Sequence, residues 1–289
     1  MDNIGIIGYG FVGKAIKESL DRLKLIKEIQ SWGTNQSSDS DSDPHQISVS
    51  IYDPVKLHVH FDNILNTNIV FIAVPTNYSE HLNNYDYSAL HENLTRLSAN
   101  SYGGLVVIKS TITPDEWYNL SKLYPTLRLT HNPEFLSART ATFDFLNQHH
   151  IVIGSNSIDD RLALANWYNN ISIKWANAQF SLVSGAEAAL IKLSCNSFYA
   201  YKISFFNMIY NLASDNDCDY KVVRKAMLHN GWINRQHTAV PGTDGKFGYG
   251  GGCLPKDSQS FSSLLSRMGR QREAELINNA IELNKLYRK

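Results

Sequence analysis

The sequence has few cysteines, no net charge and no long hydrophobic run. Its 289 residues include three cysteines, Cys195, Cys218 and Cys253, which form neither an even set nor a pair with metal-ligand spacing. We therefore expect neither a disulfide framework nor a metal site, and the thiols fit a reducing, cytoplasmic compartment. The 27 basic residues balance the 27 acidic ones, and no apolar run reaches the length of a membrane span. The composition thus favours neither nucleic acid nor a membrane as a partner.

One stretch near the end of the chain concentrates reactive and flexible residues. Residues 247–257 read Phe-Gly-Tyr-Gly-Gly-Gly-Cys-Leu-Pro-Lys-Asp. Glycines let the backbone approach a ligand closely, and the positive charge of Lys256, three residues after Cys253, favours the thiolate. Cys253 is therefore a candidate nucleophile. The alternative is a glycine-rich turn that contains a buried thiol.

The N-terminus carries the pattern of a dinucleotide-binding turn. A short apolar run, residues 3–8, leads into Gly-Tyr-Gly-Phe-Val-Gly at residues 8–13, and residues 14–24 then show helical periodicity. Between a strand and a helix, the first glycine would form a tight turn, the second would admit a pyrophosphate, and the third would let helix and strand pack closely. The helix N-terminus would add N–H groups for the phosphates. The expected cofactor-binding residues of this turn are Gly8, Gly10, Phe11, Val12 and Gly13.

A second strand predicts the residue that selects the cofactor. Residues 47–53, Ile-Ser-Val-Ser-Ile-Tyr-Asp, read as a strand that ends in Asp53. Its carboxylate would accept hydrogen bonds from the adenosine ribose and would repel the 2′-phosphate of NADP, which favours NAD. Asp53 lies later than usual for this fold, because the polar run Thr34–Gln46 reads as an inserted loop. We expect this loop to lie away from the cofactor and to be dispensable.

Strands and helices then alternate, which predicts a doubly wound parallel sheet. The expected strands are 68–74, 105–109, 127–130, 151–154 and 172–175, and the expected helices are 86–97, 114–123 and 159–169. Ligands bind beyond the carboxyl ends of such strands, where this sequence places three polar turns, Val74–Thr76, Ser110–Ile112 and Asn132–Phe135. Each turn alone could also be explained by ordinary turn and capping residues.

The alternation stops at Ser184, where a helical region begins. Residues 186–212 contain neither proline nor glycine and show apolar residues at helical spacing, so we predict one long helix. Lys192 and Asn196 lie four residues apart on it and share a face, where they could stabilise a developing negative charge. A solvated lysine is the alternative. Shorter helices are expected at 220–229, 257–268 and 272–287.

The expected fold is therefore of the α/β class, with two domains. An N-terminal Rossmann domain with a doubly wound parallel sheet would span residues 1–183. An all-helical domain with a long central helix and the cysteine loop would span residues 184–289.

Eight motifs follow one another along nearly the whole chain. They are Gly8–Gly13, Val74–Thr76, Ser110–Ile112, Asn132–Leu136, Asp144–Asn147 with Ile151–Gly154, Leu190–Lys192 with Asn196, Lys202–Phe205 with Asn207, and Phe247–Asp257. In this order they resemble the motifs of the UDP-glucose/GDP-mannose dehydrogenase family. The resemblance implies an NAD-dependent, four-electron oxidation of the C6 hydroxyl of a nucleotide sugar such as UDP-glucose, with a thioester on the motif cysteine.

The resemblance also implies roles for residues of this sequence. Cys253 would be the nucleophile, and Asp257 would position or activate the hydrolytic water. Lys192 and Asn196 would stabilise oxyanions, while Thr111 and Glu134 would handle protons through water. The cofactor would contact Val74, Pro75, Thr76 and Thr111 as well as the glycine turn. The substrate would contact Glu134, Phe135, Leu136, Lys192 and Asn196, and the backbone of Phe247, Gly248, Tyr249, Gly250, Gly251 and Gly252.

The long helix pairs subunits in the family, so the resemblance implies a homodimer. The helix carries a large amount of aromatic and aliphatic surface, from Phe198, Tyr199, Tyr201, Phe205, Phe206, Ile209 and Tyr210. Packing within one subunit is the competing explanation for these side chains.

Several features depart from the family's pattern and leave the substrate open. Family members typically continue into a further domain that grips the nucleotide, whereas this sequence ends at Lys289, so a separate chain could complete the nucleotide site. Ser137–Arg139 stand in place of Arg-Glu-Gly, Trp232 in place of an arginine, and Met208 in place of a glutamate. The substrate-binding periphery is thus altered, while the residues implied in the chemistry are present.

Two other functions fit parts of the sequence. A hydroxyacid-type dehydrogenase has the same two-domain plan and performs a single hydride transfer on a small acid, but it leaves the cysteine loop without a purpose. A non-catalytic NAD-binding interaction module is the third interpretation. The presence of Lys192, Asn196, Cys253 and Asp257 argues against it.

Overall fold

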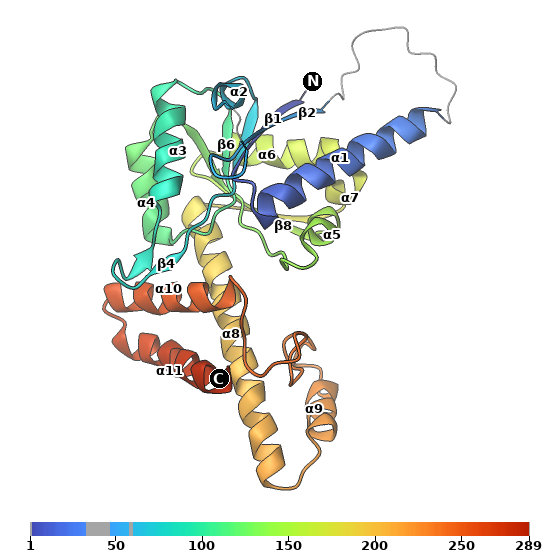
Figure 1. The fold of residues 1–289 in the computed structure, drawn as a ribbon, viewed down its shortest axis with the longest axis vertical. Helices are drawn as coiled ribbons and strands as arrows, with labels where there is room; N and C mark the ends of the chain where they lie inside the picture. Colours follow the sequence, from blue (N-terminus) through green and yellow to red (C-terminus); the bar gives the residue numbers. More distant parts are fainter. Residues whose placement is uncertain (1, 33–46, 58–59, 289) are drawn as a thin grey trace. The chain divides into compact units, whose positions relative to one another are not determined.

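The chain divides into two compact units in the computed structural model, which describes residues 2–32, 47–57 and 60–288 (Figure 1). Unit 1 comprises Met1–Thr76 and Asp86–Lys192, and unit 2 comprises Asn77–Tyr85 and Leu193–Lys289. The segment Asn77–Tyr85 thus belongs to unit 2, although it lies within the first expected domain in the sequence. The expected inserted loop, Thr34–Gln46, lies outside the described residues and stays a prediction.

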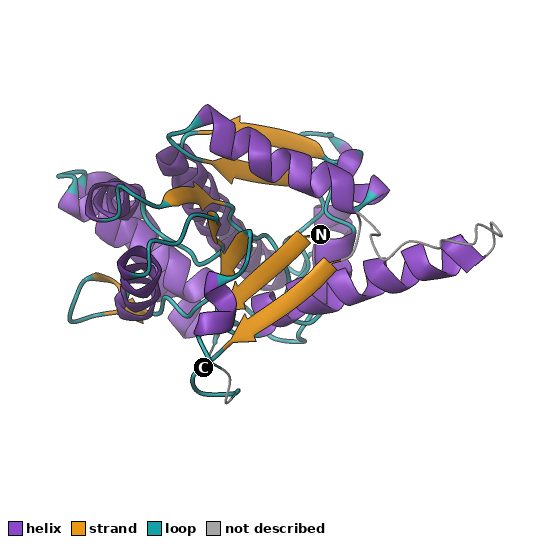
Figure 2. Cartoon of the chain, turned by 90° about the horizontal axis from the view of Figure 1, so that it is seen from above, coloured by secondary structure: helices purple, strands orange, loops and turns teal. Residues whose placement is uncertain are grey.

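Unit 1 contains one sheet, to which the described residues contribute seven strands in the order β2-β1-β3-β6-β7-β8-β9. The strands are β1 (Asp2–Ile7), β2 (Ile47–Tyr52), β3 (Ile69–Ile72), β6 (Leu105–Ile108), β7 (Arg128–His131), β8 (His150–Gly154) and β9 (Gln179–Val183). Neighbours pair in parallel except β7 and β8, which meet antiparallel at His131 and Gly154. In Figure 2 the two strands beside the N-terminus, β1 and β2, run side by side in the same direction. The expected α/β fold is confirmed, with this one departure from a fully parallel sheet.

Helices cover both faces of this sheet, because alternate strand residues point to opposite sides. The helices of unit 1 are α1 (Phe11–Trp32), α2 (Asp62–Leu65), α3 (Ser88–Ala99), α4 (Pro114–Leu123), α5 (Ala141–Leu146), α6 (Ile158–Ile171) and α7 (Ile173–Ala176). Figure 1 shows α3 and α4 on one side of the sheet and α1 and α6 on the other. Phe71 points into the core beneath α1 and α6, whereas its buried neighbours Val70 and Ile72 point to the other face.

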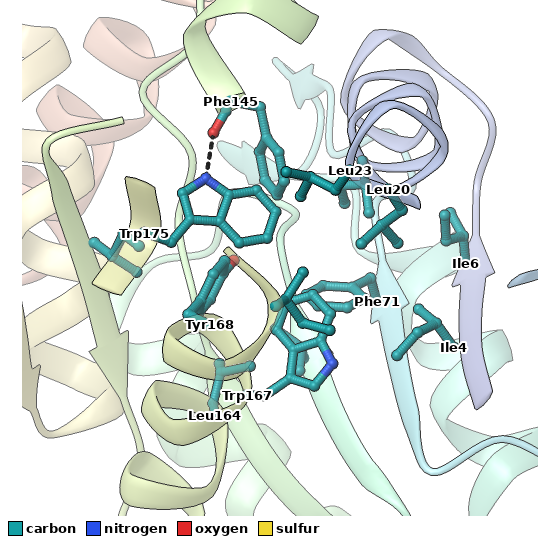
Figure 3. Packing of buried hydrophobic residues seen from close by; sticks show 14 of the residues in the cluster. Ile4, Ile6, Leu20, Leu23, Phe71, Phe145, Leu164, Trp167, Tyr168 and Trp175 are labelled. Carbon is teal, nitrogen blue, oxygen red and sulfur yellow. Dashed lines mark hydrogen bonds between the residues drawn. The ribbon is translucent and has the colours of Figure 1, made fainter. Parts of the chain in front are cut away.

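An aromatic cluster fills the core on the α1 side (Figure 3). Trp167, Tyr168 and Trp175 pack against one another with ring centroids 5.0 to 6.1 Å apart. The indole N–H of Trp175 donates to the carbonyl oxygen of Phe145 at 3.1 Å, which satisfies the polar atom of a fully buried side chain. This cluster joins the helices α5, α6 and α7 to the sheet.

The expectation of a strand at 172–175 is wrong, because the chain there forms the short helix α7. The carbonyl oxygen of Ser172 accepts hydrogen bonds from the N–H groups of Trp175 and Ala176, which closes a helical turn. That turn places Trp175 in the aromatic cluster, and burial of its ring outweighs the weak strand pattern of the segment. The last strand of the sheet is β9 instead.

Unit 2 is built from helices and one short hairpin. Its elements are β4 (Tyr78–Ser79), β5 (Asn84–Tyr85), α9 (Tyr220–His229), α10 (Leu254–Arg267) and α11 (Gln271–Tyr287). The long helix α8 (Gly185–Asp215) runs through the division after Lys192 and enters unit 2. Buried serines of α10 leave room for close packing against α11, and the hydroxyl of Ser262 donates to the carbonyl oxygen of Ala274 at 3.3 Å.

The aromatic side chains of α8 do not all lie on one surface. Phe206 is buried in unit 2, where Ile209 and Tyr210 pack against the same small core, and Tyr199 stacks on His237 at 4.8 Å. By contrast, Phe198, Tyr201, Phe205 and Leu212 are exposed, at intervals of three, four and seven residues. This spacing aligns them along one face of the helix. Of the side chains of α8 that we expected at a subunit contact, only those in the exposed stripe formed by Phe198, Tyr201, Phe205 and Leu212 are therefore available for one.

No helix within the described ranges is both long and apolar enough to cross a bilayer. In the same ranges, no three side chains of His, Cys, Asp or Glu gather as a metal site requires.

Candidate functional site

In the glycine turn of unit 1, two glycines pack against backbone atoms and one has free space beside it. Gly8 has a φ of +91°, and a Cβ there would lie 2.5 Å from the carbonyl oxygen of Ala73. A Cβ on Gly13 would collide with the carbonyl oxygen of Gly8. At Gly10 no heavy atom lies within 4 Å of the Cβ position, so the backbone is open to a ligand there. Helix α1 begins at Phe11, earlier than predicted, and its N-terminal amides lie directly after this opening.

Asp53 follows β2 and is bound to the glycine turn. Its Oδ2 accepts the N–H of Tyr9 at 2.7 Å, and its Oδ1 accepts the N–H groups of Val55 at 3.0 Å and Lys56 at 2.9 Å. Burial alone would raise the pKa of Asp53, but these hydrogen bonds and the charge of Lys56 hold it below its ordinary value. The carboxylate is therefore ionised at neutral pH. It is positioned to accept a hydroxyl hydrogen bond beside the turn.

The polar turns after β3 and β6 are joined to each other. The hydroxyl of Ser110 donates to the carbonyl oxygen of Val74 at 2.8 Å, while Thr76 and Thr111 are buried nearby in the chain. Phe11 is partly exposed and Val12 packs against the core. The structure thus brings the expected cofactor residues to the carboxyl ends of β1, β2, β3 and β6. An open glycine backbone, a helix N-terminus and an ionised carboxylate at this edge fit a dinucleotide.

Glu134 and Lys192 form a buried pair in unit 1. The ammonium group of Lys192 donates to the main-chain carbonyl oxygen of Glu134 and lies 3.5 Å from its Oε1. The other carboxylate oxygen accepts the N–H of Leu136 at 2.6 Å, which fixes the turn after β7. The ammonium also lies 5.1 Å from the ring centre of the half-exposed Phe135. The alternative of a solvated lysine is therefore excluded, because Lys192 is almost fully buried.

Lys109 is a second buried lysine near this pair, and the sequence had not marked it as a site residue. Lys109 donates to Oδ1 of Asn132 at 2.9 Å, and the hydroxyl of Tyr168 donates to the same oxygen at 2.7 Å. Burial lowers the pKa of Lys109 to about 7, with the charge of Glu134 opposing this shift and the charge of Lys192 adding to it. The charge of Glu134 thus acts on both buried lysines, although only Lys192 contacts its carboxylate. The only sequence signal was the position of Lys109 at the end of a strand.

In unit 2, Cys253 directly precedes helix α10. It is half-buried, and its carbonyl oxygen accepts the N–H of Asp257 at 3.0 Å. A thiol at a helix N-terminus lies in a positive potential, which favours the thiolate. Cys195 and Cys218 lie elsewhere in unit 2, on α8 and in the turn before α9, and no disulfide joins any two of the three cysteines.

Asp257, one helical turn after Cys253, is fully buried and accepts three hydrogen bonds. Its Oδ2 accepts from Nδ2 of Asn196 at 2.5 Å. Its Oδ1 accepts from the hydroxyl of Tyr85 at 2.5 Å and from the ammonium of Lys256 at 2.6 Å. The structure thus brings together Asn196 and Asp257, which lie 61 residues apart. Tyr85 was missed by the sequence analysis, because its hairpin lies far from both in the sequence.

Two asparagines hold the glycine-rich loop that precedes Cys253. Oδ1 of Asn207 accepts the N–H of Gly248 at 3.0 Å. Asn284 accepts the N–H of Tyr249 at 2.6 Å and donates to its carbonyl oxygen at 2.9 Å. These amides are therefore engaged within unit 2. Gly251 and Gly252 are exposed, and a Cβ at either would stand in open space. Trp232, at the position of a family arginine, is 91% exposed.

The strand order, the glycine turn and the carboxylate after β2 define a dinucleotide-binding protein of the doubly wound α/β class. The chain belongs to the UDP-glucose/GDP-mannose dehydrogenase family: the NAD binding domain of this family matches residues 2–172, and its central domain matches residues 186–286. The resemblance noted in the sequence is confirmed, as is NAD as the cofactor of the first domain.

Individual relatives agree with this assignment. A UDP-glucose 6-dehydrogenase of Campylobacter jejuni is 26% identical over 99% of this chain and 72% of its own length. One of Rickettsia bellii is 32% identical over 71% of this chain and 46% of its own length. The structure of a UDP-glucose dehydrogenase from Pyrobaculum islandicum superposes with a TM-score of 0.74 at 21% identity, and covers 98% of this chain and 68% of that one. The chain therefore spans only part of the length of these relatives.

Proposed function

We propose that the chain catalyses the NAD-dependent, four-electron oxidation of the C6 hydroxyl of a nucleotide sugar, of the UDP-glucose kind, to the uronate. The observation that supports this most is the arrangement at the start of α10. There Cys253 lies one helical turn before a buried carboxylate that is held by Asn196, Lys256 and Tyr85. A single-hydride dehydrogenase requires neither the thiol nor this carboxylate.

In this proposal, unit 1 holds the cofactor and handles the first proton. Bound NAD would accept one hydride from the substrate carbon in each of the two oxidation steps. Gly8, Gly10 and Gly13 with the first turn of α1 would hold its phosphates, and Asp53 would hold its ribose. Thr111 and Glu134 would pass the hydroxyl proton to water, while the buried ammonium of Lys192 would stabilise the alkoxide.

Unit 2 would carry the covalent chemistry. The thiolate of Cys253 would attack the aldehyde carbon, so that a C–S bond forms and the resulting oxyanion is stabilised by Lys192 and Asn196. Oxidation of this thiohemiacetal gives a thioester, which water cleaves with the help of Asp257. The atoms balance when one alcohol, one water and two NAD yield one carboxylate, two NADH and three protons.

The substrate contacts are proposed from the resemblance of the sequence motifs to those of the family. Glu134, Phe135 and Leu136 of the turn after β7 and the loop Phe247–Gly252 are the proposed contacts. Since Gly248 and Tyr249 use their N–H groups internally, the exposed Gly251 and Gly252 are the better candidates for backbone contacts. A separate chain could contribute further nucleotide contacts, and the thiols suit a cytoplasmic location.

The exposed stripe on α8 supports a homodimer. Phe198 is 59% exposed and Leu212 57%, and with Tyr201 and Phe205 they form an apolar line along the helix. Burial of such a line against its counterpart in a second copy would remove it from water. Light scattering at micromolar concentration should therefore give twice the monomer mass, and a monomer would contradict this part of the proposal.

The covalent step is tested by Cys253→Ala. Purified wild type should release two NADH and one acid for each nucleotide sugar consumed. The variant should lose acid formation by several orders of magnitude, because no thiohemiacetal can form. It should still reduce a supplied aldehyde to the alcohol with NADH, since that step needs no thiol.

Cys195→Ala and Cys218→Ala are matched controls, because both thiols lie away from the start of α10 in the sequence. Each should leave acid formation within about threefold of wild type. Acid formation at a comparable rate by Cys253→Ala would contradict the thioester. A stoichiometry of one NADH would favour the hydroxyacid-type reaction.

A further inference from the structure

The hairpin β4–β5 places a phenol on Asp257. Tyr85 is the last residue of this hairpin, and its hydroxyl donates to Oδ1 of Asp257 at 2.5 Å. Both side chains are almost completely buried, so the hydrogen bond is shielded from competing water. A phenol donating to a buried carboxylate is a charge-assisted hydrogen bond, which is stronger than one between neutral groups.

The hairpin is fixed to the helix that carries Asp257. The hydroxyl groups of Tyr78 and Ser263 lie 2.8 Å apart, and Arg267 donates to the carbonyl oxygen of Asn83 at 2.7 Å. Ser263 and Arg267 both belong to α10. Tyr85 is therefore held by contacts at the other end of the same helix, and its position relative to Asp257 is well determined within unit 2.

The donors around Asp257 are divided unequally between its two oxygens. Oδ1 accepts from both Tyr85 and Lys256, and two hydrogen bonds are what one carboxylate oxygen ordinarily accommodates. Among the described residues, Oδ2 accepts only the amide of Asn196. Oδ2 thus keeps capacity for one more donor. The ammonium of Lys256 also lies 4.6 Å from the ring centre of Tyr85. The aromatic ring therefore helps to hold Lys256 in place beside the carboxylate of Asp257.

We infer that Tyr85 is a positioning residue for thioester hydrolysis: by occupying Oδ1, it orients Asp257 so that Oδ2 receives the proton of the attacking water. This inference rests on the proposed function. In the step, the water oxygen forms a bond to the acyl carbon, the C–S bond breaks and the thiolate of Cys253 leaves. One proton of the water passes to Asp257, and no electrons are exchanged with the cofactor. The two hydride transfers precede this step and do not depend on Tyr85.

The test is Tyr85→Phe, which removes one buried hydroxyl and keeps the ring. Steady-state acid formation should fall by about tenfold or more, as expected when a general base is misaligned. The KM for NAD should stay within about twofold of wild type, and each active site should still release its first two NADH in a rapid burst. Acid-quenched protein should then carry the acyl adduct on Cys253 as its main form, detected by mass spectrometry.

Hydroxylamine provides a second measurement that a folding defect does not imitate. It attacks a thioester without a general base, forms a C–N bond and releases the thiolate. Turnover of Tyr85→Phe should therefore recover in its presence, with the hydroxamate as product. Because burst and recovery are both expressed per active site, partial unfolding of the variant changes neither ratio.

Tyr220→Phe is the matched control, since it also removes one buried hydroxyl of unit 2, and that hydroxyl donates to the carbonyl oxygen of Thr238 and not to Asp257. It should retain the wild-type rate, with no accumulated adduct. The inference is overturned if Tyr85→Phe forms acid at the wild-type rate, or if it slows the first two hydride transfers as much as hydrolysis. If wild type itself forms no acid, the proposed function fails, which is a separate result.

Discussion

The two glycine-rich segments of this protein both lead into a helix, yet they are held in different ways. The turn at Gly8–Gly13 is fixed by main-chain neighbours and by one carboxylate, Asp53, that follows the adjacent strand. The loop at Phe247–Gly252 is fixed by the side chains of Asn207 and Asn284, which lie 41 and 35 residues away in the sequence. The first segment is rigid because of close backbone contacts. The second depends on two long-range side-chain hydrogen bonds.

This difference predicts where each segment tolerates change. A glycine packed against backbone cannot accept a Cβ without moving the main chain, whereas a loop held by amide side chains fails when those amides are removed. Three substitutions test this contrast, and they are ordered here from the largest expected effect to the smallest.

Gly13→Ala should abolish NAD binding, because its Cβ would collide with the carbonyl oxygen of Gly8 and force the turn open. We expect at least a hundredfold loss of NAD affinity, measured by fluorescence titration, since a displaced turn loses several phosphate contacts together. Gly103→Ala is the control, because a Cβ at Gly103 meets no atom within 4 Å. Equal affinity in the two variants would show that the turn is less closely packed than described.

Asn284→Ala should destabilise the second segment. It leaves the N–H and carbonyl groups of Tyr249 without their partner in a buried setting, which costs about 2 kcal/mol in the free energy of unfolding. Urea unfolding measures this, and NAD affinity should stay unchanged. Asn279→Ala, on the exposed face of the same helix, is the control and should change the unfolding free energy by less than about 0.5 kcal/mol.

Asp53→Asn should alter cofactor choice and acid stability. The amide no longer repels a 2′-phosphate, so the preference for NAD over NADP in kcat/KM should fall by about tenfold. Equal use of both cofactors by wild type would contradict the role of Asp53.

The same substitution tests the hydrogen bonds to the turn. Although burial opposes them, the donors of Tyr9, Lys56 and Val55 keep the pKa of Asp53 below its ordinary value of 3.8 in the folded protein. The folded state therefore takes up this proton at lower pH than the unfolded state. The stability that results is complete above about pH 4 and is lost as the pH falls below that value. Thermal unfolding between pH 3 and 5 should thus show a smaller pH dependence in Asp53→Asn than in wild type.

Element positions were predictable where the local pattern was strong. Helices 114–123 and 220–229 have the predicted bounds, the first marked by Pro114 at its start and acidic residues in its first turn. The hairpin β4–β5 was missed because Asn77–Tyr85 has neither a strand period nor a helical one. The turn at Ser172 was taken for a strand, since burial of Trp175 among aromatic rings is a tertiary effect.

The sequence by itself determined the α/β plan, the glycine turn with its cofactor, the long helix and the family, because these follow from periodicity, glycine spacing and the order of motifs. Only the tertiary structure decided that Lys109 bonds to Asn132, that two asparagines hold the cysteine loop, and that Tyr85 bonds to Asp257. These contacts join residues tens to more than a hundred positions apart. The periodicity and the local motifs of a sequence do not predict such pairs. The hydrogen bonds form only when packing brings the buried groups together and excludes water.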